Sequence, residues 1–269
     1  MIRDITIGQY IPGDSFVHKL DPRTKIILSF LYIIELFIIK NFTGYLFAFA
    51  FILITVLLAK IPLKYIFRGL KPIFILLLFT AVLNLFMVRT GKVIYSYGFV
   101  TIYYGGLRTA SFMTIRLVLL IIGTSVLTLT TSPIELTDGI ERLLNPFKKL
   151  GLPAHEFAMM MTIALRFIPT LIDETDKIMK AQMARGADFD SGNIVQKAKS
   201  LIPLLVPLFV NSFRRADELA MAMEARCYRG GKGRTRMKVL KFSCNDLIAS
   251  LAFVLLIIIT IITNIIALI

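Results

Sequence analysis

The sequence contains no tryptophan and has only two cysteines and two histidines among its 269 residues. Cys227, Cys244, His18 and His155 are too few for a disulfide framework, and they do not stand at the spacing of a structural zinc site. We therefore expect no metal site. No arrangement of nucleophile, acid and base typical of an enzyme is found either, so we expect no catalytic residues.

Charged residues are also scarce, at 18% of the chain, whereas 57% of the residues are hydrophobic and the mean hydropathy is +0.76. Soluble domains usually carry ~25% charged residues, so this composition excludes a disordered chain and indicates a protein of the lipid bilayer. Acids are scarcer than bases, with 17 Asp and Glu against 31 Lys and Arg, which gives a net charge of +14.

Five stretches approach the ~20 apolar residues that a helix needs to cross a hydrocarbon core ~30 Å thick. They cover residues 26–39, 41–59, 72–88, 109–131 and 247–269. Lipid offers no hydrogen-bond partner to the backbone, so each stretch must be helical. We expect an all-α polytopic membrane protein with five transmembrane helices and, because the first 22 residues are polar, no cleavable signal peptide.

Two charges fall inside the first four of these spans. An arginine at mid-bilayer costs at least ~2.5 kcal/mol, which normally implies a partner. Glu35 is the only acidic residue in these spans, so pairing of Glu35 with Arg116 is one hypothesis. The other is that Arg116 reaches the outer interface by extending its side chain.

Basic residues predict the orientation, because short cytoplasmic connections are rich in Lys and Arg. The segments before the first span and between the second and third are the most basic short ones, so we expect the N-terminus on the cytoplasmic side of the plasma membrane. The predicted organisation is an N-terminal segment with four spans (1–131), cytoplasmic coupling helices (132–229), a basic linker (230–245) and a fifth span (246–269).

About three amphipathic helices are expected in the cytoplasmic region. The first begins at Ser132, where Pro133 and Glu135 complete a capping box. The others are expected from Pro153 to Gly186 and from about Asn193 to Arg229, with prolines able to kink them. Residues 154–172 are apolar enough to resemble a span, but two charges within them favour helices packed under the bilayer.

The second and third of these helices end in the same way. The two ends read Ala184-Arg185-Gly186 and Ala225-Arg226-Cys227. Arginine followed by glycine is an ordinary helix stop. However, Cys227 stands where a stop would place glycine, so we interpret the arginine after a small residue as the shared feature. Such an end suits an acidic groove on a partner, where arginine pairs in a bidentate way.

Residues 230–233 are glycine-rich, but a phosphate-binding loop needs Gly-x4-Gly-Lys followed by Ser or Thr. Arg226 stands at the position of the first glycine, and Gly233 follows Lys232. We therefore expect any ATP to be bound by partner subunits, and this chain to hold no cofactor. The basic linker is interpreted as facing lipid headgroups rather than nucleic acid.

An ordered set of motifs across nearly the whole chain resembles the transmembrane T component, EcfT, of energy-coupling factor (ECF) transporters. The motifs are GQYIPGDS at 8–15, HKLDPRTK at 18–25, GGL at 105–107, SPIEL at 132–136, RFIP at 166–169, RRADELA at 214–220 and the two Ala-Arg ends. The resemblance implies that these ends dock into two ATP-binding subunits. It also implies that the second end departs from the family by carrying Cys227 in place of glycine.

The resemblance further implies that apolar faces of the coupling helices hold an exchangeable substrate-binding membrane subunit. We place that contact at Leu143, Phe147, Phe157 and Met161. The expected function is therefore a non-catalytic coupling subunit of an ATP-driven importer of vitamins or other micronutrients. The alternative is a self-sufficient secondary carrier, although one Glu and one Arg in the first four spans give it little support.

Overall fold

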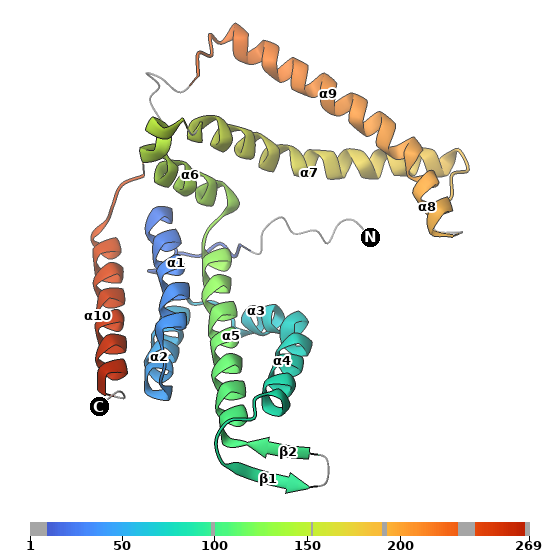
Figure 1. Ribbon diagram of the computed structural model, residues 1–269. Helices are drawn as coiled ribbons and strands as arrows, with labels where there is room; N and C mark the ends of the chain where they lie inside the picture. Colours follow the sequence, from blue (N-terminus) through green and yellow to red (C-terminus); the bar gives the residue numbers. More distant parts are fainter. Residues whose placement is uncertain (1–9, 98–99, 152, 190–192, 231–239, 267–269) are drawn as a thin grey trace. The chain divides into compact units, whose positions relative to one another are not determined.

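The computed structural model describes residues 10–97, 100–151, 153–189, 193–230 and 240–266 (Figure 1). The chain divides into two compact units. The spanning unit combines residues 8–140 with residues 239–269, and the helix-pair unit contains residues 141–238. Each unit is described by itself.

Helices dominate the spanning unit, in which α1, α2, α5 and α10 run side by side (Figure 1). Its helices are α1 (Pro22–Ile38), α2 (Phe42–Ala59), α3 (Leu63–Leu70), the 3-10 turn η1 (Lys71–Ile73), α4 (Phe74–Met87), α5 (Tyr104–Thr130), the first part of α6 (Pro133–Leu144), and α10 (Cys244–Ile266). An antiparallel hairpin of β1 (Val93–Tyr97) and β2 (Val100–Tyr103) leads into α5. The sequence did not predict this hairpin.

Five helical segments of the described chain are long and apolar enough to cross a membrane: α2, residues 63–87, α5, α7 (Ala154–Ala184) and α10. The predicted all-α polytopic fold is thus confirmed. The set differs from the predicted spans in two helices, because α1 has only 17 residues and α7 meets the criteria of length and composition. The two helices differ in their packing partners. Helix α1 packs on α5 and α10, whereas α7 packs on α9.

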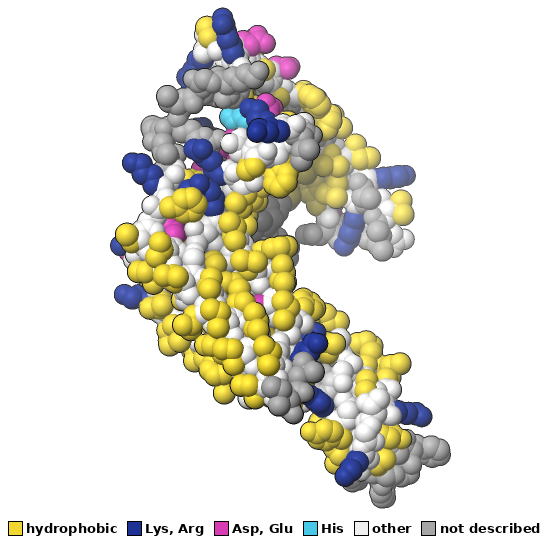
Figure 2. All heavy atoms as spheres, turned by 60° about the vertical axis from the view of Figure 1, so that its left-hand side comes forward, with side chains coloured by type: hydrophobic (Ala, Val, Ile, Leu, Met, Phe, Trp, Pro, Cys, Tyr) yellow, Lys and Arg dark blue, Asp and Glu magenta, His cyan; other side chains and the backbone are white. Residues whose placement is uncertain are grey.

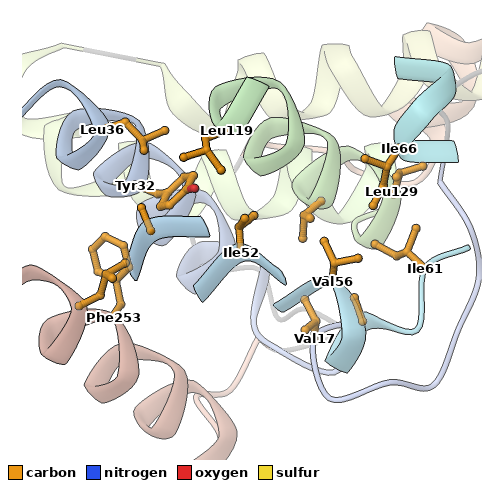
Figure 3. Packing of buried hydrophobic residues seen from close by; sticks show 14 of the residues in the cluster. Val17, Tyr32, Leu36, Ile52, Val56, Ile61, Ile66, Leu119, Leu129 and Phe253 are labelled. Atoms are coloured by element: carbon orange, nitrogen blue, oxygen red, sulfur yellow. The ribbon is translucent and has the colours of Figure 1, made fainter. Parts of the chain in front are cut away.

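The core of the spanning unit lies where α1, α2, α5 and α10 meet (Figure 3). Leu36, Leu119 and Phe253 are at most 1% exposed there. Gly123 lets α5 approach α1, because a Cβ at this position would lie 2.7 Å from the ring of Tyr32. Apolar side chains also cover the forward face of this unit (Figure 2), as expected of helices that face lipid.

Hydrogen bonds hold the start of α1 against the start of α10 and the end of α5. The N–H of Asp21 donates to Asp246 Oδ1 over 2.8 Å. The buried Lys25 Nζ donates to the carbonyls of His18 and Thr130 at 3.0 and 2.9 Å. These bonds place the two helix starts and the helix end at one boundary of the unit.

The hypothesis that Glu35 pairs with Arg116 is wrong. Glu35 Oε1 accepts a hydrogen bond of 2.7 Å from the hydroxyl of Thr260 on α10. Arg116 Nε donates to the hydroxyl of Tyr45 over 2.9 Å, and its guanidinium lies 5.1 Å from the ring centre of Phe37. The two charges therefore have separate polar partners on neighbouring helices.

The helix-pair unit is built on two long helices that pack against each other. Its elements are the end of α6, the 3-10 turn η2 (Asn145–Leu150), α7, α8 (Ile194–Ser200) and α9 (Ile202–Ala225). The predicted cap of α6 is present, because Ser132 Oγ accepts a hydrogen bond from the N–H of Glu135. The helix expected from about Asn193 to Arg229 is instead two helices, α8 and α9, separated at Leu201. Pro203 lies in the first turn of α9, where a proline is tolerated, and α9 ends at Ala225.

Candidate docking ends and apolar faces

The C-terminal end of α7 forms a regular left-handed cap. Gly186 has φ +87°, its N–H donates to the carbonyl of Met183, and the N–H of Ala187 donates to the carbonyl of Gln182, both over 3.0 Å. This pattern of hydrogen bonds is the Schellman motif. Arg185 is thereby held as the last residue before the chain reverses.

The C-terminal end of α9 repeats this geometry with cysteine in the glycine position. Cys227 has φ +55°, its N–H donates to the carbonyl of Glu224 over 2.8 Å, and the N–H of Tyr228 donates to the carbonyl of Met223 over 3.0 Å. The argument that a capping role would have kept glycine is therefore wrong. The two ends share one backbone conformation, so the difference between glycine and cysteine does not by itself distinguish them.

A left-handed cysteine carries strain that glycine would relieve. Cys227→Gly is expected to stabilise the protein by about 1 kcal/mol, because the left-handed conformation costs an L-residue roughly 1–2 kcal/mol and glycine loses part of this gain through its freer unfolded chain. Gly186→Ala is expected to destabilise by a similar amount. Thermal unfolding of the purified protein in detergent measures both changes. Cys227→Ser is the control, and a gain equal to that of Cys227→Gly would contradict a conformational cause.

Both arginines at these ends are accessible. Arg185 and Arg226 are exposed, and neither forms an ion pair with another residue in the described part of the chain. A guanidinium at the negative end of a helix has a favourable position. It also keeps its planar set of donors available for a carboxylate on another protein.

Side-chain interactions fasten α7 to α9 between the two ends. Glu174 Oε1 accepts a hydrogen bond of 2.7 Å from Asn211 Nδ2, and Glu174 Oε2 lies 2.9 Å from Arg215 Nη2. Gln182 Nε2 donates to the carbonyl of Pro203 over 3.3 Å. The helices run in opposite directions, so their capped C-terminal ends lie at opposite ends of the pair (Figure 1).

Additional side-chain contacts hold the end of α9, and the sequence did not predict them. His155 Nδ1 lies 3.0 Å from Glu141 Oε1 on α6, and His155 Nε2 lies 3.5 Å from the hydroxyl of Tyr228. Tyr228 follows the left-handed Cys227, so these contacts tie the capped end of α9 to α6 and to the start of α7. A lone histidine and a lone tyrosine 73 residues apart carry no sequence pattern that would predict this contact.

The predicted apolar contact residues lie at the end of α6, in η2 and on the first turns of α7. Phe147, Phe157 and Met161 are 47%, 53% and 50% exposed, and Leu143 is half-buried. Phe157 and Met161 are four residues apart and share one face of α7. These side chains are therefore available to a partner.

A larger apolar surface lies on α9, where sequence analysis assigned no contact. Its side chains are 54–64% exposed and recur at intervals of three and four residues, which places them on one helix face. This α9 stripe consists of Ile202, Leu205, Val206, Phe209, Val210 and Phe213. The buried Leu204 and the Glu174 partners Asn211 and Arg215 are outside the stripe. The helical spacing within residues 201–213 was the signal that could have identified it.

Sites for small ligands are not evident at these ends. No group of three or more His, Cys, Asp or Glu side chains in the described residues could hold a metal ion. The basic linker predicted to face lipid headgroups lies mostly outside the described residues, since 231–239 are not among them. The exposed arginines and apolar faces fit protein surfaces better than they fit a small molecule.

Comparison with known proteins decides the family. The profile of the CbiQ family, described as cobalt transport protein, matches residues 13–238, which include both capped ends. A Clostridium kluyveri protein named energy-coupling factor transporter transmembrane protein EcfT is 66% identical over 98% of both chains. This chain belongs to the EcfT family. Proteins of the same name from Thermosediminibacter oceani (64% identical over 93% of this chain and 94% of the relative) and Bacillus subtilis (52% over 91% and 93%) agree.

Membership of the EcfT family confirms the resemblance drawn from the motifs. The relatives' name identifies transmembrane proteins of a transporter, so this chain is a membrane protein with a role in transport. The name also implies a complex with other subunits.

Proposed function

We propose that this chain is the coupling subunit of an ATP-driven ECF-type importer, and that it transmits movement of two ATP-binding subunits to a substrate-binding membrane subunit. One observation carries the proposal. Two helix ends with the same left-handed cap each present an exposed arginine. They lie at opposite ends of a helix pair that is held together by hydrogen bonds and an ion pair. Two equivalent docking points suit two ATPases, and the firm link between the helices suits transmission of force.

The apolar faces support a second kind of partner. Phe147, Phe157, Met161 and the α9 stripe are exposed on the same unit as the docking arginines. Exposed apolar patches rimmed by polar residues mark protein or membrane contacts. We propose that they hold the substrate-binding membrane subunit, and that its cargo is a vitamin or another micronutrient.

In this proposal the chain lies in the plasma membrane with its N-terminus and the helix-pair unit on the cytoplasmic side. The basic connections support this orientation. We propose that α1 crosses the bilayer despite its 17 residues, because Lys25 and Lys40 flank its apolar stretch and Glu35 Oε1 accepts a hydrogen bond from Thr260 of α10. We propose that α7 lies outside the bilayer, since it carries exposed charges at Glu156 and Arg166.

Purification from native membranes tests the proposal against a secondary carrier. A coupling subunit is expected to co-purify with ATPases and a small membrane protein, identified by mass spectrometry. A carrier that works by alternating access would be isolated alone and would drive uptake in liposomes without ATP. Either of these two results for the wild-type chain would overturn the coupling function.

The isolated chain is expected to hydrolyse no ATP, because it lacks a phosphate-binding loop. Phosphate release by the purified chain, compared with the same preparation after removal of trace ATPases, is the measurement. Hydrolysis that persists after that removal contradicts the expectation. The partner ATPases added back serve as the positive control.

A further inference from the structure

The short helix α3 presents three different faces. Ile66 is 5% exposed, and a Cβ on Gly69 would lie 3.3 Å from Ser125 Oγ, so this face packs on α5. Leu63 and Phe67, four residues apart, are 56% and 66% exposed. The third face carries only basic side chains. A helix with one face on protein, one apolar face exposed and one cationic face has the character of a helix that lies in a membrane interface.

The position of α3 agrees with an interfacial location. Its contact residue Ser125 lies five residues before the end of α5, close to Thr130, which binds Lys25 at the start of α1. The 3-10 turn η1 separates α3 from α4, and Lys64, Arg68 and Lys71 all precede α4, which contains no charged residue. The hydrocarbon core therefore suits α4, and α3 lies at its edge.

The cationic face is not neutralised within the described part of the chain. Lys64, Arg68 and Lys71 are exposed, and no described carboxylate forms an ion pair with any of them. Residues 60–71 contain no acid, and like charges four residues apart on a helix repel. Lys60 is left out of the site because it shares a small cavity with Asp14. Arg68 lies 5.8 Å from the ring centre of Tyr65, a contact that leaves its charge without a carboxylate. Three cations without a carboxylate, beside exposed apolar side chains, suit an anionic and amphipathic counterpart.

We propose that α3 is a binding site for anionic phospholipids of the bilayer. Lys64, Arg68 and Lys71 contact the phosphate groups, and Leu63 and Phe67 contact the upper acyl chains. A basic residue near an anionic membrane surface strengthens binding by roughly fivefold. This assignment is independent of the docking ends, because it concerns residues of the spanning unit and a ligand that the bilayer itself supplies.

The absence of tryptophan from the chain provides a direct local test. Phe67→Trp places the single tryptophan of the chain on the exposed face of α3, and excitation at 295 nm avoids the tyrosines. The full-length variant is reconstituted in phosphatidylcholine vesicles, and quenching by brominated phosphatidylglycerol is compared with quenching by brominated phosphatidylcholine. We expect at least a fivefold preference for phosphatidylglycerol at low salt, and a smaller preference at 0.5 M salt because screening weakens exposed charges.

Charge variants show whether the cations cause this preference. In the Phe67→Trp background, Lys64→Gln, Arg68→Gln and Lys71→Gln together are expected to reduce it to below twofold, and Arg68→Gln alone to an intermediate value. The control removes the same number of exposed charges elsewhere, with Lys148→Gln, Lys149→Gln and Lys180→Gln, and should leave the preference unchanged. Equal quenching by both lipids in the parent, or a preference that survives loss of all three α3 charges, would overturn the site. If the triple variant does not fold, the intermediate preference expected for Arg68→Gln alone still tests the site.

Discussion

Arg185→Ala and Arg226→Ala are each expected to lower ATPase association and transport at least tenfold, and the double variant is expected to lose assembly. Removing one partner of a desolvated charge pair costs ~2–5 kcal/mol, whereas losing only a favourable helix-end charge costs under ~1 kcal/mol. Tenfold corresponds to about 1.4 kcal/mol, so the measurement separates the two roles. Co-purification of ATPases and substrate uptake in reconstituted vesicles measure the effect.

The capped helix ends make this prediction specific. Both arginines precede a left-handed residue whose backbone hydrogen bonds do not involve the arginine side chain, so alanine leaves the cap intact. Arg214→Ala is the matched control, because Arg214 is an exposed arginine on α9 that pairs with Glu218 within its own helix. Lysine at position 185 or 226 should rescue poorly, since it cannot pair in a bidentate way. If both alanine variants assemble and transport normally, the Ala-Arg ends are only helix stops.

Phe147→Asp is expected to release the substrate-binding subunit while the ATPases remain bound. Phe147 is 47% exposed in η2, so aspartate is tolerated in the free chain but places an unpaired charge in a buried apolar contact. The expected loss of capture is tenfold or more, because an uncompensated buried charge costs several kcal/mol. Capture of the substrate-binding subunit by the tagged chain is compared with retention of the ATPases in the same sample.

The α9 stripe provides a second position for this experiment. Phe209 is 64% exposed and contacts Phe213 with ring centres 4.7 Å apart, so Phe209→Asp disrupts the centre of the stripe. Phe209→Leu is its control, because leucine keeps the apolar surface. If Phe147→Asp and Phe209→Asp both leave capture intact, these faces do not hold the membrane subunit. Loss of both partners together indicates that the helix-pair unit has unfolded.

Several features could be read from the sequence because they depend on short-range patterns. The long apolar runs predicted most of the transmembrane helices, and Ser132 with Pro133 and Glu135 predicted the start of α6. The repeated Ala-Arg ends identified Arg185 and Arg226 as equivalent positions. Each of these signals comes from residues close together in the chain, where backbone geometry and hydropathy act locally.

Other features were mispredicted because they depend on how helices rotate and pack. Glu35 and Arg116 were matched by charge, but the packing of α1, α2, α5 and α10 turns Glu35 toward Thr260 and Arg116 toward Tyr45. Cys227 stands where a helix stop usually has glycine, which argued against a cap, yet two backbone hydrogen bonds hold the chain there at φ +55°. The contact of His155 with Tyr228 joins residues with no shared pattern.

The sequence by itself determined that this protein is helical and lies in a membrane, and its repeated Ala-Arg pattern identified Arg185 and Arg226 as related positions. Hydropathy and helix-end chemistry are properties of neighbouring residues, so they are available before folding. Only the tertiary structure decided which polar groups satisfy one another inside the spanning unit and which apolar face of α9 is left uncovered. Both outcomes depend on the rotation of each helix about its axis, and that rotation is set by the packing of residues distant in the chain.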